Sequence, residues 1–345
     1  MNIGGDHGRV RTLAWGLVAL VVVAGVGAML ASGEAAATVA GAARAASEAH
    51  WAVVPVVSAL VVVHFWFSAV ALRGAAGRPL PLLHATMAQF TGATANRITG
   101  GGLGTVAVNA RYLTAQGVPA GRSVAVAGVL QVAGAVADLL LFGVVVAVAV
   151  AAGDGVLLRH MPAVGGETLA VGAAVAAAVC AVAGLAGWLL RDRLRGAVAD
   201  GFRVCAQMLR RPGDMLVMLL ASAATTLVMG VAFAVSMLAV PGAVSPGQIG
   251  TLLTIFMIGA AAGGVVPGPG GLGSTEAALV ALLAVVGVGA AEALSGVLIF
   301  RALTHWAPVP IGLLAAGTVR RRKPAQVVAL PALEQQETSA VAHAA

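Results

Sequence analysis

A few residues with the chemistry to bind a charged ligand lie inside long apolar segments of this chain. Arg97, Arg111 and Arg301 are cations, Asp138 and Glu276 are acids, and their neighbours are mostly Ala, Val, Leu and Gly. A charge in such surroundings is costly and usually faces a partner or a water-filled cavity. The three arginines therefore predict contact with an anionic group.

The same charges also permit a structural interpretation. Arg301 would then pair with Glu276, and Arg97 or Arg111 would pair with Asp138, or the arginines would extend toward the membrane surface. For Arg301 we favour a functional cavity. For Arg97 both interpretations stand, and Arg111 also suits a position at the interface.

Polar side chains accompany these charges. Asn96, Asn109 and Gln131 are the polar neighbours expected near the arginines. Asp138 follows Gln131 by seven residues, which puts both on one face of a helix. Asp138 could take part in proton coupling or make a structural hydrogen bond.

The histidines and cysteines do not indicate a metal site. His64 and His84 lack metal-ligand spacing, so we interpret them as packing or interface residues. His305, four residues after Arg301, is a candidate headgroup contact. Because no metal, cofactor or catalytic motif is apparent, we expect no cofactor and no enzymatic activity.

The composition excludes a soluble protein. Of the 345 residues, 60% are hydrophobic and 10% are charged, whereas a soluble domain has about 25% charged residues. The net charge of +7 belongs to short loops beside apolar segments, so we interpret it as a topological signal and expect no nucleic-acid partner. The sequence predicts an all-α, polytopic membrane protein.

Apolar blocks of about 20 residues or more predict membrane-spanning helices. The first follows Arg9 and Arg11, and its apolar run is too long for a signal peptide, so we expect an anchor. The six predicted full spans cover residues 12–32, 51–72, 123–152, 168–190, 215–240 and 291–318.

Two further apolar regions, 80–117 and 248–288, are interrupted by glycine-rich breaks. If the N-terminus is cytoplasmic, 15 of the 20 Lys and Arg residues fall on the inner face, which predicts that both termini lie there. Each interrupted region must then enter and leave on the same side. We expect two re-entrant hairpins, one entered from the cytoplasm and one from outside.

The two hairpins resemble each other in sequence. Gly-Gly-Leu-Gly occurs at 101–104 and at 270–273, and a Gly-Val pair follows at 117–118 and at 287–288. Gln131 and Arg301 lie at the same distance beyond these pairs. Because the copies face opposite sides, the sequence predicts an inverted-topology repeat, an architecture that secondary transporters use.

Breaks inside a membrane require a buried or water-filled setting, because they leave backbone groups without partners. After the second break, Ser274-Thr275-Glu276 predicts a helix start, whose N–H groups would suit an anion. The residues expected to break the hairpins are Gly101, Gly102, Gly104, Pro267, Pro269, Gly270, Gly271 and Gly273.

The motifs at 96–104 and 267–276 resemble those of the lysylphosphatidylglycerol synthase transmembrane, or flippase-like, family of bacterial integral membrane proteins. The resemblance extends from about residue 50 to 318. It implies an integral-membrane domain that moves aminoacylated or other polar-headed lipids between leaflets. It also implies that Arg97, Glu276 and Arg301 occupy the family's characteristic polar positions.

The chain departs from the family pattern in two places. Gly100 stands where the second motif has Pro269, and Gln131 stands where many members carry a charged residue. The soluble aminoacyl-transferase domain has no room after Lys323. We expect one flippase-like domain over 1–322, with half-repeats at about 51–152 and 215–318, and a disordered cytoplasmic tail over 323–345.

The leading hypothesis is a non-enzymatic flippase-like transporter in the plasma (inner) membrane that moves a polar or anionic phospholipid or glycolipid. The residues expected to bind it are Arg97, Arg301, Glu276, Asn96, Arg111, Asp138 and His305. The alternatives are a small-anion secondary transporter and a non-transporting partner of a separate lipid-modifying transferase. The lipid, the energy source and the oligomeric state stay open.

Overall fold

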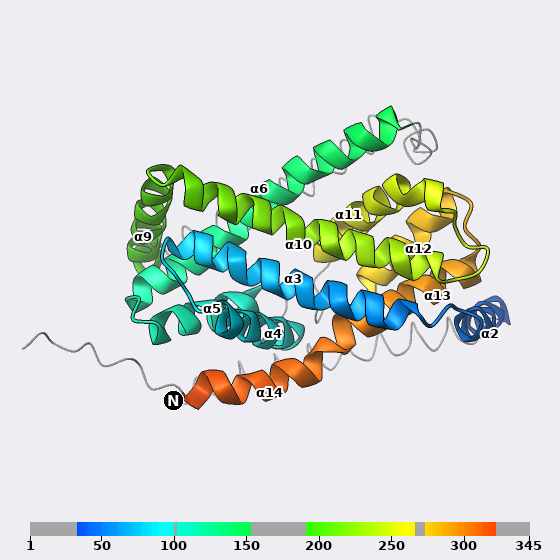
Figure 1. Ribbon diagram of the computed structural model, residues 1–345, viewed down its shortest axis with the longest axis horizontal. Coiled ribbons are helices and arrows are strands. Elements are labelled where there is room, and N and C mark those ends of the chain that lie inside the picture. Colours follow the sequence, from blue (N-terminus) through cyan, green and yellow to red (C-terminus); the bar gives the residue numbers. More distant parts are fainter. Residues whose placement is uncertain (1–32, 100–101, 153–190, 266–272, 322–345) are drawn as a thin grey trace, which may run out of the picture.

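A computed structural model of the chain describes residues 33–99, 102–152, 191–265 and 273–321. Within these ranges the chain is helical and contains no strand. Figure 1 shows an elongated bundle in which α3 and α10 run side by side along the long axis.

The first half of the bundle consists of α3 (Val53–Ala76), α4 (Leu82–Thr99), α5 (Leu103–Ala115) and α6 (Ala120–Ala151). Helices α4 and α5 pack against each other as a hairpin, and α5 also packs on α6. Gly92 of α4 allows this approach, since a Cβ there would lie 3.3 Å from the Thr105 Cα. Small residues permit such close helix packing without a hydrophobic driving force.

The second half repeats this order. A long helix, α10, is followed by the hairpin of α11 and α12 and then by a long broken helix formed by α13, η3 and α14. The bounds are α10 Pro212–Leu238, α11 Ile249–Val265, α12 Ser274–Val285, α13 Ala290–Arg301, η3 Ala302–Trp306 and α14 Pro308–Arg321, with a short turn η1 at Pro246–Gln248.

The turn after each hairpin has the same backbone geometry. Gly117 and Gly287 both adopt positive φ, at 83° and 85°, which favours glycine. The N–H groups of Val118 and Val288 donate to the carbonyls of Leu113 and Leu283, each at 3.1 Å. The sequence match of the two Gly-Val pairs therefore corresponds to two equivalent helix ends.

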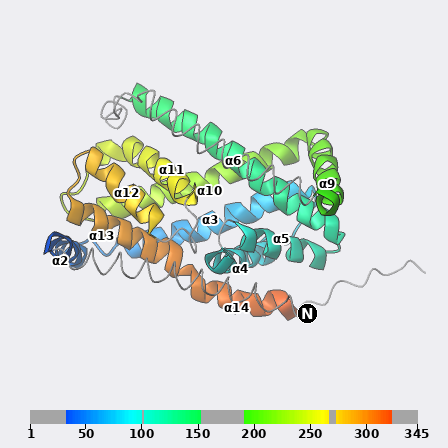
Figure 2. The ribbon, with the colours of Figure 1, turned by 180° about the vertical axis from the view of Figure 1, so that it is seen from behind.

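The two hairpins lie at opposite ends of the molecule. Helix α3 leads to the end where α4 begins, and α10 runs the other way to the end where α11 begins (Figures 1 and 2). Two clusters of buried side chains follow this division. One contains Phe233, Phe256 and Phe300, and the other contains Leu72 and Leu113.

Four helical segments are long and apolar enough to cross a membrane. They match four of the six predicted spans, and the spans predicted at 12–32 and 168–190 lie outside the described residues. The four segments are Val53–Ala76, Ala120–Ala151, Pro212–Leu238 and Ala290–Gly317. The last is not the uninterrupted helix expected, because it contains the wide turn η3.

Two helices lie outside these two halves. The alanine-rich α2 (Gly33–Ser47) packs against α13 and was not predicted, although alanine strongly favours helix. Helix α9 (Arg191–Leu209) lies across one end of the bundle beside α6 (Figures 1 and 2). Arg191, Arg193 and Arg195 make the first turns of α9 basic, and apolar residues alternate with polar ones along the helix as in an amphipathic helix.

Candidate functional site

The inner ends of the hairpins carry glycines that bring helices close together. Gly102 precedes α5 with a φ of 79°, and a Cβ at this position would lie 2.7 Å from the Gln131 Nε2. A Cβ on Gly104 would collide with the backbone of Ala95 and Asn96. These two predicted break residues therefore allow the tip of the first hairpin to close and to approach α6.

The tip of the second hairpin is organised by Glu276. Gly273 precedes α12 with a φ of 85°, and its N–H donates to the Glu276 Oε2 at 2.8 Å. A carboxylate in the first turn of a helix interacts favourably with the helix dipole. We expected the N–H groups at this helix start to be free to bind an anion. Instead, Glu276 already accepts a hydrogen bond from one of them.

Glu276 also holds Arg301. The Arg301 Nε donates to the Glu276 Oε1 at 2.6 Å, and the two side chains are only 13% and 17% exposed. One carboxylate thus connects the start of α12 to the end of α13. This pair is the one that the structural interpretation of the sequence anticipated.

Directly after Arg301 the helix widens into η3, a π-helical turn. The Ala307 N–H donates to the Ala302 carbonyl five residues earlier, at 2.9 Å. Such turns are rare and often occur at functional sites. Here the turn carries His305, which is buried and lies against Trp306 with the ring centroids 5.4 Å apart.

Arg97, Arg301, Glu276 and His305 form one cluster. Arg97 lies within electrostatic range of Arg301, and His305 lies within electrostatic range of Arg97, Arg301 and Glu276. Among the described residues, the buried atoms Arg97 Nε, Asn96 Oδ1 and His305 Nε2 have no hydrogen-bond partner. Buried polar atoms are normally satisfied, so such exceptions need a reason. The cluster contains two guanidinium groups and one carboxylate.

Asp138 belongs to a different place. Its Oδ1 accepts a hydrogen bond from the Thr226 Oγ1 at 2.5 Å, which makes α10 its partner rather than Arg97 or Arg111. The predicted pairing of Asp138 with either arginine does not occur in the described part of the chain. The structure thus contains the hydrogen bond that was one of the two uses considered for Asp138.

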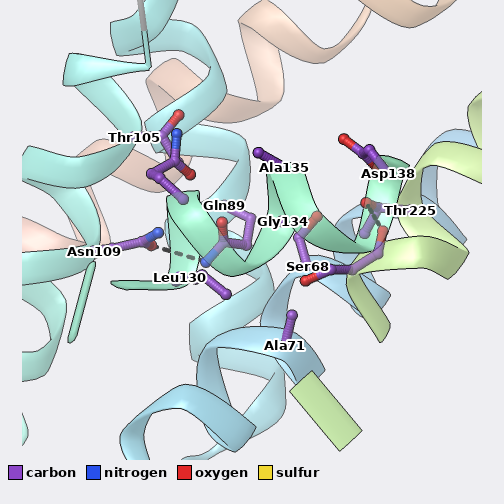
Figure 3. Close-up of a pocket in the computed structure, with 12 residues that line it drawn as sticks. Ser68, Ala71, Gln89, Thr105, Asn109, Leu130, Gly134, Ala135, Asp138 and Thr225 are labelled. Carbon is purple, nitrogen blue, oxygen red and sulfur yellow. Dashed lines mark hydrogen bonds between the residues drawn. The ribbon is translucent and has the colours of Figure 1, made fainter. Parts of the chain in front are cut away.

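Asp138 and Gln131 line one cavity of about 340 Å³, as their spacing on α6 indicated. Figure 3 shows Asp138 and Thr225 at one end of it, and Gln89 and Asn109 at the other. The Gln89 Nε2 donates to the Asn109 Oδ1 at 2.8 Å. Sequence reasoning missed the contributions of Ser68, Gln89, Ser222 and Thr225, which lie in apolar helices without a motif.

The remaining predicted site residues are not part of either group. Arg111 is exposed on α5, and its neighbour Tyr112 donates from its hydroxyl to the Pro81 carbonyl at 3.3 Å. Arg111 therefore fits the interface interpretation. The predicted break residues Gly101, Pro267, Pro269, Gly270 and Gly271 lie outside the described residues.

Comparison with known families gives one match. The sequence matches the family described as the lysylphosphatidylglycerol synthase TM region over residues 16–312. No curated protein sequence matches the chain. Together with the four long apolar helices, the family match identifies a multi-pass membrane protein.

Proposed function

Because the chain belongs to the lysylphosphatidylglycerol synthase TM region family, we propose that it is a transporter that moves lipids with a polar or anionic headgroup between membrane leaflets. The membership confirms the resemblance that the two glycine motifs carry. The membership supports a lipid-related role in the membrane. We assign the binding of the lipid headgroup to the polar cluster around Arg97 and Arg301.

The observation that carries the proposal is the charge of Arg97, which forms no ion pair with any described residue. The ion pairs found in the described residues are Arg301–Glu276 and Arg203–Asp200, so neither of these acids neutralises Arg97. A guanidinium at membrane depth is costly unless it meets an anion. A lipid phosphate is such an anion, and it forms short, charge-assisted hydrogen bonds with arginine.

The surroundings of Arg97 suit a headgroup better than an isolated ion. The Asn96 Oδ1 is a free acceptor beside it, and the His305 Nε2 is a second unpartnered polar atom. A headgroup that presents a phosphate and hydroxyl or amino groups would satisfy both kinds of atom. Glu276 holds Arg301 in place, so that the guanidinium groups of Arg97 and Arg301 can both contact the headgroup.

The arrangement of the hairpins supports alternating access. We infer that each hairpin is re-entrant, that the halves form an inverted-topology repeat, and that the cluster lies near the bilayer midplane. Secondary transporters bind substrate at the interface of such repeats. Rocking of one half against the other would expose Arg97 and Arg301 to each leaflet in turn.

The orientation follows from the basic residues. Arg203 is on α9, and the Arg122 guanidinium donates to Gln207 of α9. Arg211, just after α9, donates to the Gly77 carbonyl at the end of α3, whose last turn contains Arg73, so these basic residues share the end of the bundle where α9 crosses. By the positive-inside rule this end is cytoplasmic, and both termini then lie on the cytoplasmic side of the plasma membrane. The role is transport rather than catalysis, without a cofactor, and a separate lipid-modifying transferase is the natural partner that would supply the lipid.

A leaflet assay tests the proposal. The full chain is reconstituted in vesicles that contain headgroup-labelled phosphatidylglycerol or its aminoacylated form, and label accessibility from outside is followed over time. We expect protein-dependent equilibration of the label between leaflets. Rates equal to those of protein-free vesicles for all lipids would reject a flippase, and uptake of a small anion by the same vesicles would favour the alternative transporter.

A further inference from the structure

The polar cavity between α3, α4, α5, α6 and α10 is separate from the arginine cluster and contains a single charged side chain. Its lining residues are Ser68, Ala71, Gln89, Thr105, Asn109, Leu130, Gln131, Gly134, Ala135, Asp138, Ser222 and Thr225. Gln131 and Ala135 are exposed on α6, so the cavity reaches the surface of the bundle.

The charge in this cavity is negative and lacks a basic partner. Asp138 accepts one hydrogen bond, from Thr226, and no ion pair involving it occurs in the described ranges. A carboxylate within an apolar helix bundle carries a desolvation cost that a single hydroxyl does not offset. A positively charged occupant would remove that cost.

The titratable groups on the neighbouring helices do not provide this charge. His64 of α3 uses its Nδ1–H to donate to the Thr225 carbonyl at 3.1 Å. The side chains of α11, which also packs on α6, include no ionisable group. Arg122 and Gln207 join α6 to α9 at the start of α6, and Arg111 of α5 is exposed.

The end of the cavity around Asp138 is rich in oxygen atoms. Ser68, Ser222 and Thr225 contribute hydroxyl groups, and the Thr226 hydroxyl touches the carboxylate. Carboxylate, hydroxyl and carbonyl oxygens are the ligands of hard cations. In the part of the chain that the structure describes, no three His, Cys, Asp or Glu side chains gather as they would around a metal ion. One carboxylate with neutral oxygens fits a monovalent cation.

The two halves carry different side chains at matching positions. Gln131 lies beside Gly102 at the start of α5, and Arg301 lies beside the Gly273–Glu276 cap at the start of α12. Gln131 and Arg301 also occupy the same distance after their Gly-Val turns. The first half thus has a neutral side chain where the second has a cation, and the charged side chain that lines the cavity is Asp138.

From these observations we propose that the cavity at Asp138 binds a small monovalent cation, a proton or Na⁺, and that this cation accompanies the anionic headgroup during transport. Binding of the cation stands on the cavity alone, and its coupling to transport rests on the proposed function. The basic cluster, formed by Arg97 of the first half and Arg301 of the second, receives the anion, and the acidic cavity of the first half receives the cation. Moving both together reduces the net charge that crosses the bilayer.

Thermal unfolding of the purified full chain tests the binding site. The melting temperature is measured in NaCl and in choline chloride at equal ionic strength, across a range of pH. If Na⁺ is the ligand, we expect saturating NaCl to raise the melting temperature of the native protein by about 3 °C. The variant Asp138→Asn should lose this response, and Asp200→Asn, on α9, should keep it.

The proton gives a different pattern. Without a Na⁺ effect, lowering the pH should raise the melting temperature of the native protein toward that of Asp138→Asn, which resembles the protonated form. Equal responses of the native protein and Asp138→Asn to both Na⁺ and pH would overturn the proposal. Should Asp138→Asn fail to fold, Thr226→Val retains the carboxylate and should weaken the same response.

The leaflet assay with an imposed Na⁺ or pH gradient tests the coupling. An inward gradient of the cation that stabilises the native protein in the unfolding experiment, Na⁺ or the proton, should accelerate lipid movement several-fold. The variant Asp138→Asn should show no such acceleration. Lipid movement that ignores both gradients would reject coupling while the proposed flippase stands. If the cation raises the melting temperature but no lipid movement occurs, the flippase proposal is rejected and the proposal of a cation site stands.

Discussion

Arg301 and Glu276 meet through a 2.6 Å contact between Nε and Oε1, and the second oxygen of the same carboxylate accepts the Gly273 N–H. A single acid thereby starts one helix and fixes the cation that ends another. Because both side chains are largely buried, neither charge can be removed without leaving the other poorly compensated. The pair holds Arg301 and Glu276 in fixed positions, and Arg97 is the guanidinium of the cluster that has no ion-pair partner among the described residues.

The Arg301–Glu276 pair should be strongly coupled in stability. We expect Glu276→Gln and Arg301→Gln each to destabilise the protein by about 3 kcal/mol, because each leaves a buried charge behind. The double variant should be less destabilised than the sum of the two. Melting temperatures of the four proteins in one detergent provide the cycle, and strictly additive losses would mean that the pair contributes nothing as a pair.

Arg97 should matter for transport more than for folding. The variant Arg97→Gln keeps a polar but shorter side chain and removes a charge that has no carboxylate partner among the described residues. We expect lipid movement in the leaflet assay to slow by about 10-fold or more, the loss typical of a charged hydrogen bond. The melting temperature should fall little or rise, since a buried charge is removed.

The control for Arg97 is Arg111→Gln, because Arg111 is an exposed arginine of the same hairpin. Its transport rate should stay within about twofold of the native rate, as expected for a surface charge that makes little contribution. Equal losses for both variants would show that the assay responds to the net charge of the hairpin and not to the cluster.

Gly104 should tolerate no side chain. A Cβ there would collide with the backbone of Ala95 and Asn96, so Gly104→Ala must push α4 and α5 apart. We expect a destabilisation of about 1–3 kcal/mol and a loss of lipid movement, because the hairpin tip carries Asn96 and Arg97. A Cβ at Gly143 on α6 meets nothing within 4 Å. Gly143→Ala should therefore leave the melting temperature unchanged or slightly higher.

The opposed hairpins can be tested by labelling. Ala120 and Ala290 are the exposed first residues of the helices that follow the two hairpins. In a background with Cys180→Ser and Cys205→Ser, we expect Ala120→Cys to react with an impermeant maleimide only from the cytoplasmic side. Ala290→Cys should react only from outside. Labelling of both positions from one side would contradict the inverted repeat.

The long helices could be predicted because their length and apolar composition are local properties. Four predicted spans correspond to apolar helices within a few residues at each end, and the two Gly-Val pairs correspond to two equivalent turns. The α2 helix was missed because its alanines are not apolar enough to signal a span. The π-helical turn at 302–306 was missed because the apolar pattern runs through it without interruption.

The site residues divide in the same way. Their type and rarity in an apolar chain singled out Arg97, Glu276, Arg301 and Asp138 as residues that need partners. Their pairing depended on which helices approach one another, and that is a property of packing. Asp138 faces α10 and bonds to Thr226, and no spacing in the sequence connects those two residues.

The sequence by itself therefore determined the membrane class, the order of the two halves and the list of costly charges, because each follows from composition or from local backbone preferences. The tertiary structure alone decided that Glu276 pairs with Arg301, that Arg97 forms no ion pair with a described residue, and that Asp138 lines a cavity away from both. The physical reason is that electrostatic compensation acts over a few ångströms. Only the packing of helices that are distant in sequence sets those distances.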